Sequence, residues 1–291
     1  MIKIIVLGDL NLDVIGQLPT WVPRGGEVRT TIKTRPGGSA ANFARSVAQH
    51  EGIQVTFIGC VGDDPAGRFL VTALAEQGIE MQVKRAPLPT GTIISLTDGK
   101  ERTILCSRGA NDALDESFIE ASWFNDPVHL HLSGYAFLSP GQARAADRAV
   151  SLAKEKGMSV SLTAPPANLI RKFGVKDFLA AIAPVDWLFL NYDEGKAITD
   201  ADIPEEIVDV LAQKFALGAL TLGKAGSLAW EGENRDRGVL EPLENADTTG
   251  AGDAFAAGFV VNYLKERNLN RANRSGINVA YSLLHGRITP V

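Results

Sequence analysis

The sequence predicts an α/β protein: a three-layer sandwich in which helices flank a mostly parallel central sheet, with a small β-sheet lid beside it. Short, nearly continuous apolar runs alternate with segments whose apolar residues recur every three or four positions. Two segments in the first third of the chain break this alternation. At 291 residues and 45% hydrophobic content, the chain can fill a large core.

The alternating apolar runs and amphipathic segments define the expected sandwich. The apolar runs are typical of strands that helices cover on both faces. They are Ile2–Leu7, Val55–Cys60, Val128–Leu132, Ser159–Leu162, Trp187–Leu190 and Ala219–Leu222. Helical spacing of apolar residues predicts helices over Ser39–Gln49, Ala66–Gln77, Gly141–Lys156, Glu205–Phe215 and Gly252–Lys265. Strands separated by helices in this way pair in parallel.

The two interrupting segments, Gly16–Arg35 and Pro87–Cys106, combine Pro, Gly and Thr with alternating strand-like patterns. We expect them to form one small sheet that covers an edge of a single domain spanning residues 1–291. The lid would be built from residues of about 11–35 and 87–108. Apolar residues on its strands would allow a homodimer through the lid, or would equally be buried within one chain. These residues are Val28, Ile32, Ile93 and Ile104.

Composition excludes several classes of function. A net charge of −5, from 29 basic and 34 acidic residues, argues against a nucleic-acid or anionic membrane partner bound through bulk positive charge. Cys60 and Cys106 are too few for a disulfide framework. No apolar run approaches the ~18 residues of a membrane span. The expectation is a cytoplasmic protein.

One segment, Asp247-Thr-Thr-Gly-Ala-Gly-Asp253, runs directly into an apolar helix pattern. A Gly-Ala-Gly turn at a helix start gathers unpaired backbone N–H groups and the positive end of the helix dipole at one point. The glycines let the backbone approach an anion closely, because no Cβ intervenes. The segment therefore predicts a phosphate-binding site.

Asp253 stands beside this predicted anion site. One interpretation is structural, since Asp often complements the dipole in the first turn of a helix. The functional interpretation is that Asp253 accepts the proton of a substrate hydroxyl while the neighbouring amides stabilise a phosphoryl group in transit. On this interpretation the helix dipole keeps Asp253 ionised at neutral pH, and the carboxylate is a weak base.

Other nucleotide and metal motifs are absent from the sequence. It contains no G-x-x-x-x-G-K-[ST] phosphate loop, and no G-x-G-x-x-G follows the first strand. The four histidines lack metal-binding spacing. Neither a P-loop protein nor a dinucleotide-binding fold is supported.

Several motifs in series resemble those of ribokinase-like carbohydrate kinases. Asp247–Asp253 resembles their C-terminal signature. The segments Gly37–Asn42 and Gly59–Asp64 resemble their N-terminal signature, Gly8–Asp13 their first strand with its substrate-binding acid, and Asn191–Glu194 their N-x-x-E element. Order and spacing agree over essentially the whole chain, which makes the series far more specific than any single motif.

The resemblance implies roles for residues at two sites. Asp253 would be the catalytic base, and the amides of Gly250, Ala251 and Gly252 would bind the γ-phosphoryl group of ATP. The residues expected to hydrogen-bond sugar hydroxyls are Asn11, Asp13, Gly37, Gly38 and Asn42. Carboxylate and amide acceptors suit a polyol. The alternative for Asp13 and Asn42 is a structural role in a turn or as a helix cap.

The resemblance also implies cofactors. Asn191 and Glu194 would organise Mg²⁺ largely through water, although Asn and Glu after a strand can also simply begin a helix. Nucleotide contacts would come from Thr221, Gly223, Gly226 and Asn278. Many family members bind K⁺ through carbonyls around the loop that contains Asp247.

Two departures bear on the substrate. Ribokinases have Lys-Gly where this chain has Ser39-Ala40, which argues against ribose. Arg108 is a candidate to face an anionic group of the substrate, with a solvated surface charge as the alternative.

The sequence thus predicts an ATP-dependent kinase that phosphorylates a hydroxymethyl group of a sugar or sugar derivative. A nucleoside kinase on the same scaffold is the alternative, and it would need an aromatic platform for the base, for which Trp21, Tyr135 and Phe137 are candidates. A sugar or nucleotide sensor without catalysis is a third class. The retained Asp253, glycine turn and Asn191/Glu194 argue against it.

Overall fold

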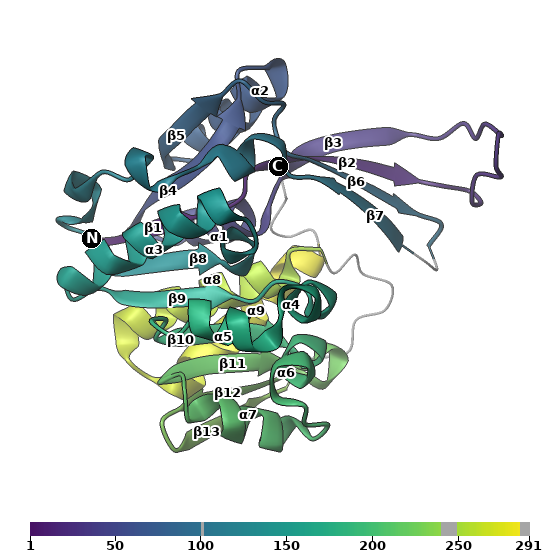
Figure 1. Cartoon of the computed structure of the whole chain (residues 1–291). Coiled ribbons are helices and arrows are strands. Elements are labelled where there is room, and N and C mark those ends of the chain that lie inside the picture. The colour runs from purple at the N-terminus through teal and green to yellow at the C-terminus, as the bar shows by residue number, and fades with distance from the viewer. Residues whose placement is uncertain (100–101, 240–248, 286–291) are drawn as a thin grey trace.

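The computed structural model describes residues 1–99, 102–239 and 249–285. Within these residues the chain forms a nine-stranded sheet of order β13-β12-β11-β10-β9-β8-β1-β4-β5 and a separate four-stranded sheet of order β3-β2-β6-β7 (Figure 1). The larger sheet is parallel except for β12 and β13, which pair in antiparallel fashion. The predicted fold class is confirmed.

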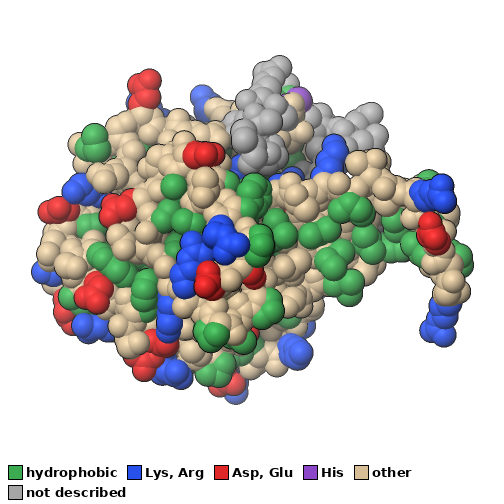
Figure 2. Space-filling view, turned by 90° about the horizontal axis from the view of Figure 1, so that it is seen from above, with side chains coloured by type: hydrophobic (Ala, Val, Ile, Leu, Met, Phe, Trp, Pro, Cys, Tyr) green, Lys and Arg blue, Asp and Glu red, His purple; other side chains and the backbone are tan. Residues whose placement is uncertain are grey.

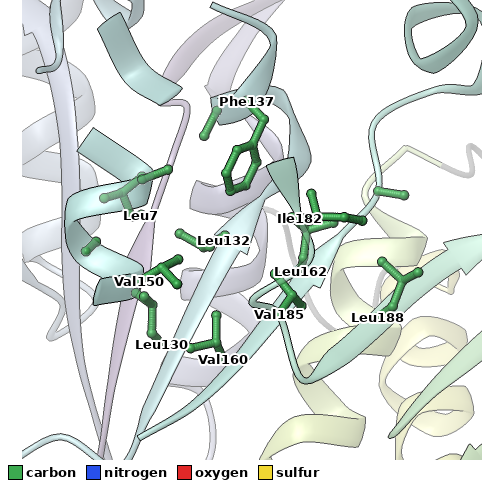
Figure 3. Close-up of a cluster of buried hydrophobic side chains, with 14 of the residues drawn as sticks. Leu7, Leu130, Leu132, Phe137, Val150, Val160, Leu162, Ile182, Val185 and Leu188 are labelled. Atoms are coloured by element: carbon green, nitrogen blue, oxygen red, sulfur yellow. The ribbon is translucent and has the colours of Figure 1, made fainter. Parts of the chain in front are cut away.

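Two hydrophobic cores, one on each face of the large sheet, hold the described part of the chain together. Helices α1, α2, α8 and α9 pack in one core, and α3 to α7 in the other (Figure 1). Figure 3 shows part of the second core, where Leu130, Val150 and Val160 meet beneath Phe137. In β1, Ile4 and Val6 enter one core and Ile5 and Leu7 the other, as expected for a strand buried on both faces.

The strands of the large sheet are β1 (Ile2–Leu7), β4 (Ile53–Gly62), β5 (Glu80–Ala86), β8 (His129–Ser133), β9 (Ser159–Thr163), β10 (Trp187–Asn191), β11 (Leu217–Thr221), β12 (Ser227–Glu231) and β13 (Asn234–Gly238). The helices are α1 (Ser39–Ala48), α2 (Pro65–Ala75), α3 (Pro140–Glu155), α4 (Ala167–Phe173), α5 (Val175–Ala181), α6 (Tyr192–Thr199), α7 (Pro204–Ala212), α8 (Ala251–Glu266) and α9 (Leu269–Leu284). None of the described helices is long and apolar enough to cross a membrane.

The four-stranded sheet, which we call the lid, consists of β2 (Asn11–Gln17), β3 (Ile32–Gly37), β6 (Thr92–Thr97) and β7 (Arg102–Ser107). It projects from the body of the molecule (Figure 1), and hydrophobic side chains lie along the projecting arm (Figure 2). Of the apolar lid residues named above, Ile32 and Ile104 are each 53% exposed. Dimerisation through this surface stays a prediction.

The lid strands differ in extent from the expectation. β2 begins at Asn11, where the lid was expected to begin, and so starts before the strand-like segment Gly16–Arg35, in which residues 18–31 form no strand. The reason is that β2 pairs with β3 over Asn11–Gly16 and with β6 over Leu12–Gln17, which extends the ladder back to the edge of the body.

The carboxyl ends of the parallel strands meet at one edge of the large sheet. After β5 the chain returns to the other side of β1 to form β8, so the strand order reverses at β1. In open α/β sheets such a reversal opens a crevice beyond the strand ends, which is where ligands bind. The lid is connected to the body at this same edge, because β2 follows β1 after three residues.

The packing of α1 against the sheet gives a test of this architecture. Phe43 on α1 is fully buried, and its ring stacks on His131 with centroids 3.4 Å apart. We expect Phe43→Ala to lower the free energy of unfolding by about 3–5 kcal/mol, because it leaves a cavity under α1. The control, Phe69→Ala on α2, removes a side chain that is 45% exposed and should cost under ~1 kcal/mol. Equal losses for both variants in urea unfolding would contradict the packing described here.

Candidate active site

A cavity of about 690 Å³ lies beyond the carboxyl ends of the parallel strands, between the lid and the body. Its size suits a small ligand together with part of a nucleotide. Three elements contribute many of its polar side chains: the lid, the start of α1 and the start of α8. The described residues that line it include Asp9, Asn11, Asp13, Gly38, Ser39, Asn42, Arg102, Tyr135, Asn191, Glu194, Thr221, Thr249, Gly250, Gly252 and Asp253.

Asp253 occupies the first turn of α8 and is 8% exposed at the cavity wall. Two neutral donors from α1 hold its carboxylate. Ser39 Oγ donates to Oδ1 at 2.7 Å, and Asn42 Nδ2 donates to Oδ2 at 3.2 Å. The carboxylate is therefore fixed in orientation without being neutralised by either of these partners.

Gly250, Ala251 and Gly252 form the start of α8. Gly250 precedes the helix with φ 80° and ψ 0°, a left-handed conformation that glycine adopts without a steric penalty. The N–H groups of the first turn have no acceptor within the helix. A Cβ at Gly252 would meet no described atom within 4 Å, so the cavity reaches the backbone here. The geometry is that of an anion site at a helix N-terminus.

The protonation of Asp253 differs from the sequence expectation of an ionised, weak base. Burial raises its pKa to about 7, against the opposing effect of the hydrogen bonds from Ser39 and Asn42. Desolvation thus outweighs these two hydrogen bonds at this position. A carboxyl group with a pKa near neutrality is a stronger base than an ordinary aspartate and still loses its proton at physiological pH.

Asn191 and Glu194 both line the cavity and also begin α6. The Asn191 side chain accepts from the Glu194 amide at 3.0 Å, and the Asn191 amide donates to the Glu194 carboxylate at 2.8 Å. This reciprocal pair is a capping box, so the helix-start interpretation is correct for both residues. Burial, together with the charge of Asp253, raises the pKa of Glu194 to about 8.

A buried carboxyl of this kind can bind a hydrated cation. Magnesium is held in proteins by one or two carboxylates together with waters and substrate phosphates. Among the residues that the structure describes, no group of three or more His, Cys, Asp or Glu side chains could form a protein-only metal cage. Glu194 and the neighbouring Asn191 amide fit a magnesium site of one carboxylate completed by waters and phosphates.

The polar residues expected to bind substrate meet at the base of the lid. Asn11 and Asp13 project from the same face of β2 into the cavity, and both are under 10% exposed. Asn11 Oδ1 accepts from Asn111 Nδ2 at 2.8 Å, and Asp13 lies 3.8 Å from the Arg35 guanidinium. Gly37 does not itself line the cavity. It is required because a Cβ there would come within 2.2 Å of the Asp13 carboxyl.

Arg108 does not line the cavity, and it is not a solvated surface charge either. Its guanidinium donates to both carboxylate oxygens of Asp9 at 2.9 and 3.2 Å, and it also bonds to Asp112 and Gln142. Asp9 is 4% exposed and lines the cavity. Arg108 therefore contacts Asp9, a residue of the cavity wall, rather than the cavity itself.

The residues assigned to the nucleotide are only partly brought together. Thr221, at the end of β11, lines the cavity. Gly223 and Gly226 lie outside its lining, in the turn that links β11 to β12. Asn278 is exposed on α9 and is likewise outside the lining. Asp247 falls outside the described residues.

Sequence reasoning assigned no role to six residues with polar side chains at the cavity: Asp9, Ser39, Arg102, Thr163, Asn168 and Thr249. Asp9 had a detectable signal, since it directly follows a buried strand where α/β proteins place ligands. Ser39 and Arg102 approach α8 from 214 and 147 residues away in the sequence. No local pattern marks such long-range contacts.

Comparison with known proteins agrees with this geometry. The model of the pfkB family of carbohydrate kinases matches residues 1–284. An ATP-dependent ribose-1-phosphate kinase from Halopiger xanaduensis is 29% identical over 283 residues, which covers 94% of this chain and 88% of that protein. A ribokinase from Haemophilus influenzae is 27% identical, with coverage of 93% and 88%.

Solved structures share the fold. A protein described as a ribokinase II from E. coli, in complex with ATP and Mg²⁺, superposes with a TM-score of 0.87 at 18% identity, covering 98% of this chain and 93% of that one. The likeness of the fold, the order of the motifs and the match over residues 1–284 lead to one conclusion. The chain belongs to the pfkB family of carbohydrate kinases.

Proposed function

We propose that this protein transfers the γ-phosphoryl group of ATP to a hydroxymethyl group of a sugar or sugar derivative. The observation that carries the proposal is the buried Asp253 carboxylate beside the open N-terminus of α8. A base and an anion site that share one helical turn suit in-line transfer from a phosphate to an alcohol.

The residues around Asp253 have distinct roles in this proposal. The substrate hydroxyl takes the place of Ser39 at the carboxylate, which then accepts its proton. The N–H groups of Gly250, Ala251 and Gly252 stabilise the charge of the phosphoryl group in transit. The lid covers the cavity and excludes water, which limits hydrolysis of ATP.

The hydrogen-bonding groups and charges of the cavity residues indicate which of them would bind the substrate and which the cofactors. Asn11, Asp13, Gly38 and Asn42 offer hydrogen-bonding groups for a polyol, and Gly37 keeps Asp13 in place. Glu194 and Asn191 would hold hydrated Mg²⁺, which supplies charge neutralisation of the phosphates when bound. A K⁺ site at Asp247 and Thr221 as a nucleotide contact stay predictions.

The nucleoside alternative has less support at this cavity. Of the three aromatic residues considered as a base platform, Tyr135 lines it, whereas Trp21 and Phe137 do not. One aromatic ring from this set does not make a stacking clamp. A sugar acceptor therefore agrees better with the polar base of the lid.

The principal test is phosphoryl transfer itself. ATP consumption is measured with Mg²⁺, with and without K⁺, against pentoses, hexoses, keto-acid sugars and nucleosides. We expect turnover with a sugar, and Asp253→Asn should lower kcat by about 10³-fold or more while ATP binding persists, because proton acceptance and positioning are lost together. Near wild-type turnover of Asp253→Asn would refute the base assignment.

The pH dependence of kcat/KM tests the state of Asp253. Since the base must be unprotonated, kcat/KM should fall tenfold per pH unit below about 7. The Ser39 hydrogen bond lowers the pKa of Asp253, so Ser39→Ala should move this acid limb to higher pH. Ser151→Ala on the exposed face of α3 is the control and should leave it in place. A shift of the acid limb of Ser39→Ala to lower pH would contradict the proposed interaction between Ser39 and Asp253.

The raised pKa of Asp253 also predicts a cost in stability. The pKa of Asp253 in the folded protein is about 7, above the ordinary value of 3.8. Between these pH values the folded protein binds more protons than the unfolded chain, so the free energy of unfolding falls as pH rises from about 4 to 7. Asp253→Asn removes this pH-dependent loss. The free energy of unfolding of the variant, minus that of wild type, should therefore be roughly 3–4 kcal/mol larger at pH 8 than at pH 4.

Thermal unfolding across pH measures this effect, and Asp126→Asn is the matched control because its side chain is 73% exposed. The control should track the wild type at every pH. A difference between Asp253→Asn and wild type that stays constant from pH 4 to pH 8 would show that Asp253 is not desolvated.

A further inference from the structure

Arg108, which directly follows β7, lies behind one wall of the cavity. Its Nη1 and Nη2 atoms donate to the two carboxylate oxygens of Asp9 at 2.9 and 3.2 Å. Nε donates to Asp112 at 2.6 Å, and Nη2 also donates to the fully buried side chain of Gln142. Asp9 lines the cavity, whereas Arg108, Asp112 and Gln142 do not. All three nitrogen atoms of the guanidinium are therefore engaged by protein groups.

A second arginine is held behind a carboxylate in the same way. Asp13 lines the cavity, and its Oδ2 atom lies 3.8 Å from Nε of Arg35, its neighbour across the ladder of β2 and β3. Arg35 does not line the cavity. At the base of the lid a ligand thus meets two carboxylates first, because the arginine that accompanies each of them stands on its far side.

The cation that does line the cavity stands elsewhere. Arg102 is the one Lys or Arg among the described lining residues. It is the first residue of β7, at the opposite end of that strand from Arg108, and its Nη1 atom donates to Thr249 just before α8. The wall formed by Asp9 and Asp13 therefore presents negative charge to the cavity.

The remaining polar group at this wall is a donor. Asn11 Oδ1 accepts from Asn111 Nδ2 at 2.8 Å, which leaves the amide N–H groups of Asn11 for the cavity. A sugar hydroxyl both donates and accepts, so it can satisfy the Asp9 and Asp13 oxygens as well as the Asn11 amide. A phosphate or carboxylate only accepts, and it would face two carboxylates of like charge.

We propose that Asp9 is a specificity-determining residue: it keeps the charge of Arg108 out of the cavity and so restricts the acceptor to uncharged sugars and polyols. The inference rests on the proposed function and names the substrate class within it. A repulsive group that acts against the wrong ligand is a common source of specificity. Without the Asp9 carboxylate, the guanidinium one hydrogen bond behind the wall would attract a phosphate or carboxylate of the acceptor.

The test uses pairs of acceptors that differ by one anionic group. The pairs are ribose with ribose 1-phosphate, fructose with fructose 6-phosphate, and glucitol with gluconate. Calorimetry without nucleotide measures the Kd of each compound, and kinetics with ATP and Mg²⁺ measure kcat/KM. We expect wild type to bind the uncharged member of at least one pair at least tenfold more tightly than its anionic counterpart. Equal or tighter binding of the anionic members, or no binding of any uncharged member, would overturn the inference.

Three variants separate the role of Asp9 from bulk charge. Asp9→Asn should reduce the preference for the uncharged member at least tenfold, by lowering the Kd of the anionic one. The matched control is Asp112→Asn, which removes the same charge from the same guanidinium. Asp112 is outside the cavity lining and its side chain is 44% exposed, so the preference should stay as in wild type.

The double variant Asp9→Asn/Arg108→Gln should lose the gain in binding of anionic acceptors, because the cation is then absent. If Asp9→Asn and Asp112→Asn change the preference equally, or if the double variant keeps the gain, Asp9 does not act through Arg108 and the inference is wrong. Thermal unfolding of each variant verifies that it is folded. If Asp9→Asn does not fold, the Kd ratios of wild type still decide whether the acceptor is uncharged.

The two proposals fail separately. If wild type binds an uncharged sugar but phosphorylates none, the proposed function fails, whereas the Kd ratios still decide the role of Asp9. If wild type phosphorylates sugars and Asp9→Asn leaves the preference unchanged, the inference is wrong and the kinase assignment stands.

Discussion

Desolvation of the Asp253 carboxyl is the constraint on which the candidate site depends. In water the group would be an ordinary weak base, but the walls formed by α1 and α8 raise its pKa to about 7. The fold tolerates this cost because Ser39 and Asn42 donate hydrogen bonds to both oxygens. Neutral donors orient the group without lowering its pKa as far as a direct ion pair would. The result is a carboxyl group with a fixed orientation and a pKa near neutrality.

The two cores explain how α1 and α8 are brought together at this point. Both helices pack on the same face of the sheet, and α1 is fixed there by the buried Phe43. Because β1 is the strand at which the sheet order reverses, the loops that follow β1 and β8 diverge and leave the cavity open. The lid strands begin directly after β1, so the cover is connected to the same edge that it covers.

Local patterns predicted much of this arrangement. The buried strands were recognisable as apolar runs, and Gly250 and Asp253 lie within one short motif whose geometry is local. The antiparallel pair β12 and β13 was not predicted, because Asn234–Gly238 contains few apolar residues and is held by pairing with β12 rather than by burial. The surroundings of Arg108 were not predicted for a related reason. Its partner Asp9 lies 99 residues away, and only the folded chain shows that the guanidinium faces a buried carboxylate.

Glu194 shows how one residue serves both fold and site. Its carboxylate completes the cap of α6, which fixes it at the cavity wall, yet burial and the charge of Asp253 raise its pKa to about 8. Two carboxyl groups with raised pKa values therefore face the same cavity, and the ionisation of one disfavours the ionisation of the other. In the proposed function, a cation at Glu194 would favour the ionised form of this carboxyl group and so link metal binding to proton release. In the proposed function, the repulsion between the two ionised carboxylates would be lowest with a cation bound at Glu194, which is the state in which Asp253 has to be without its proton.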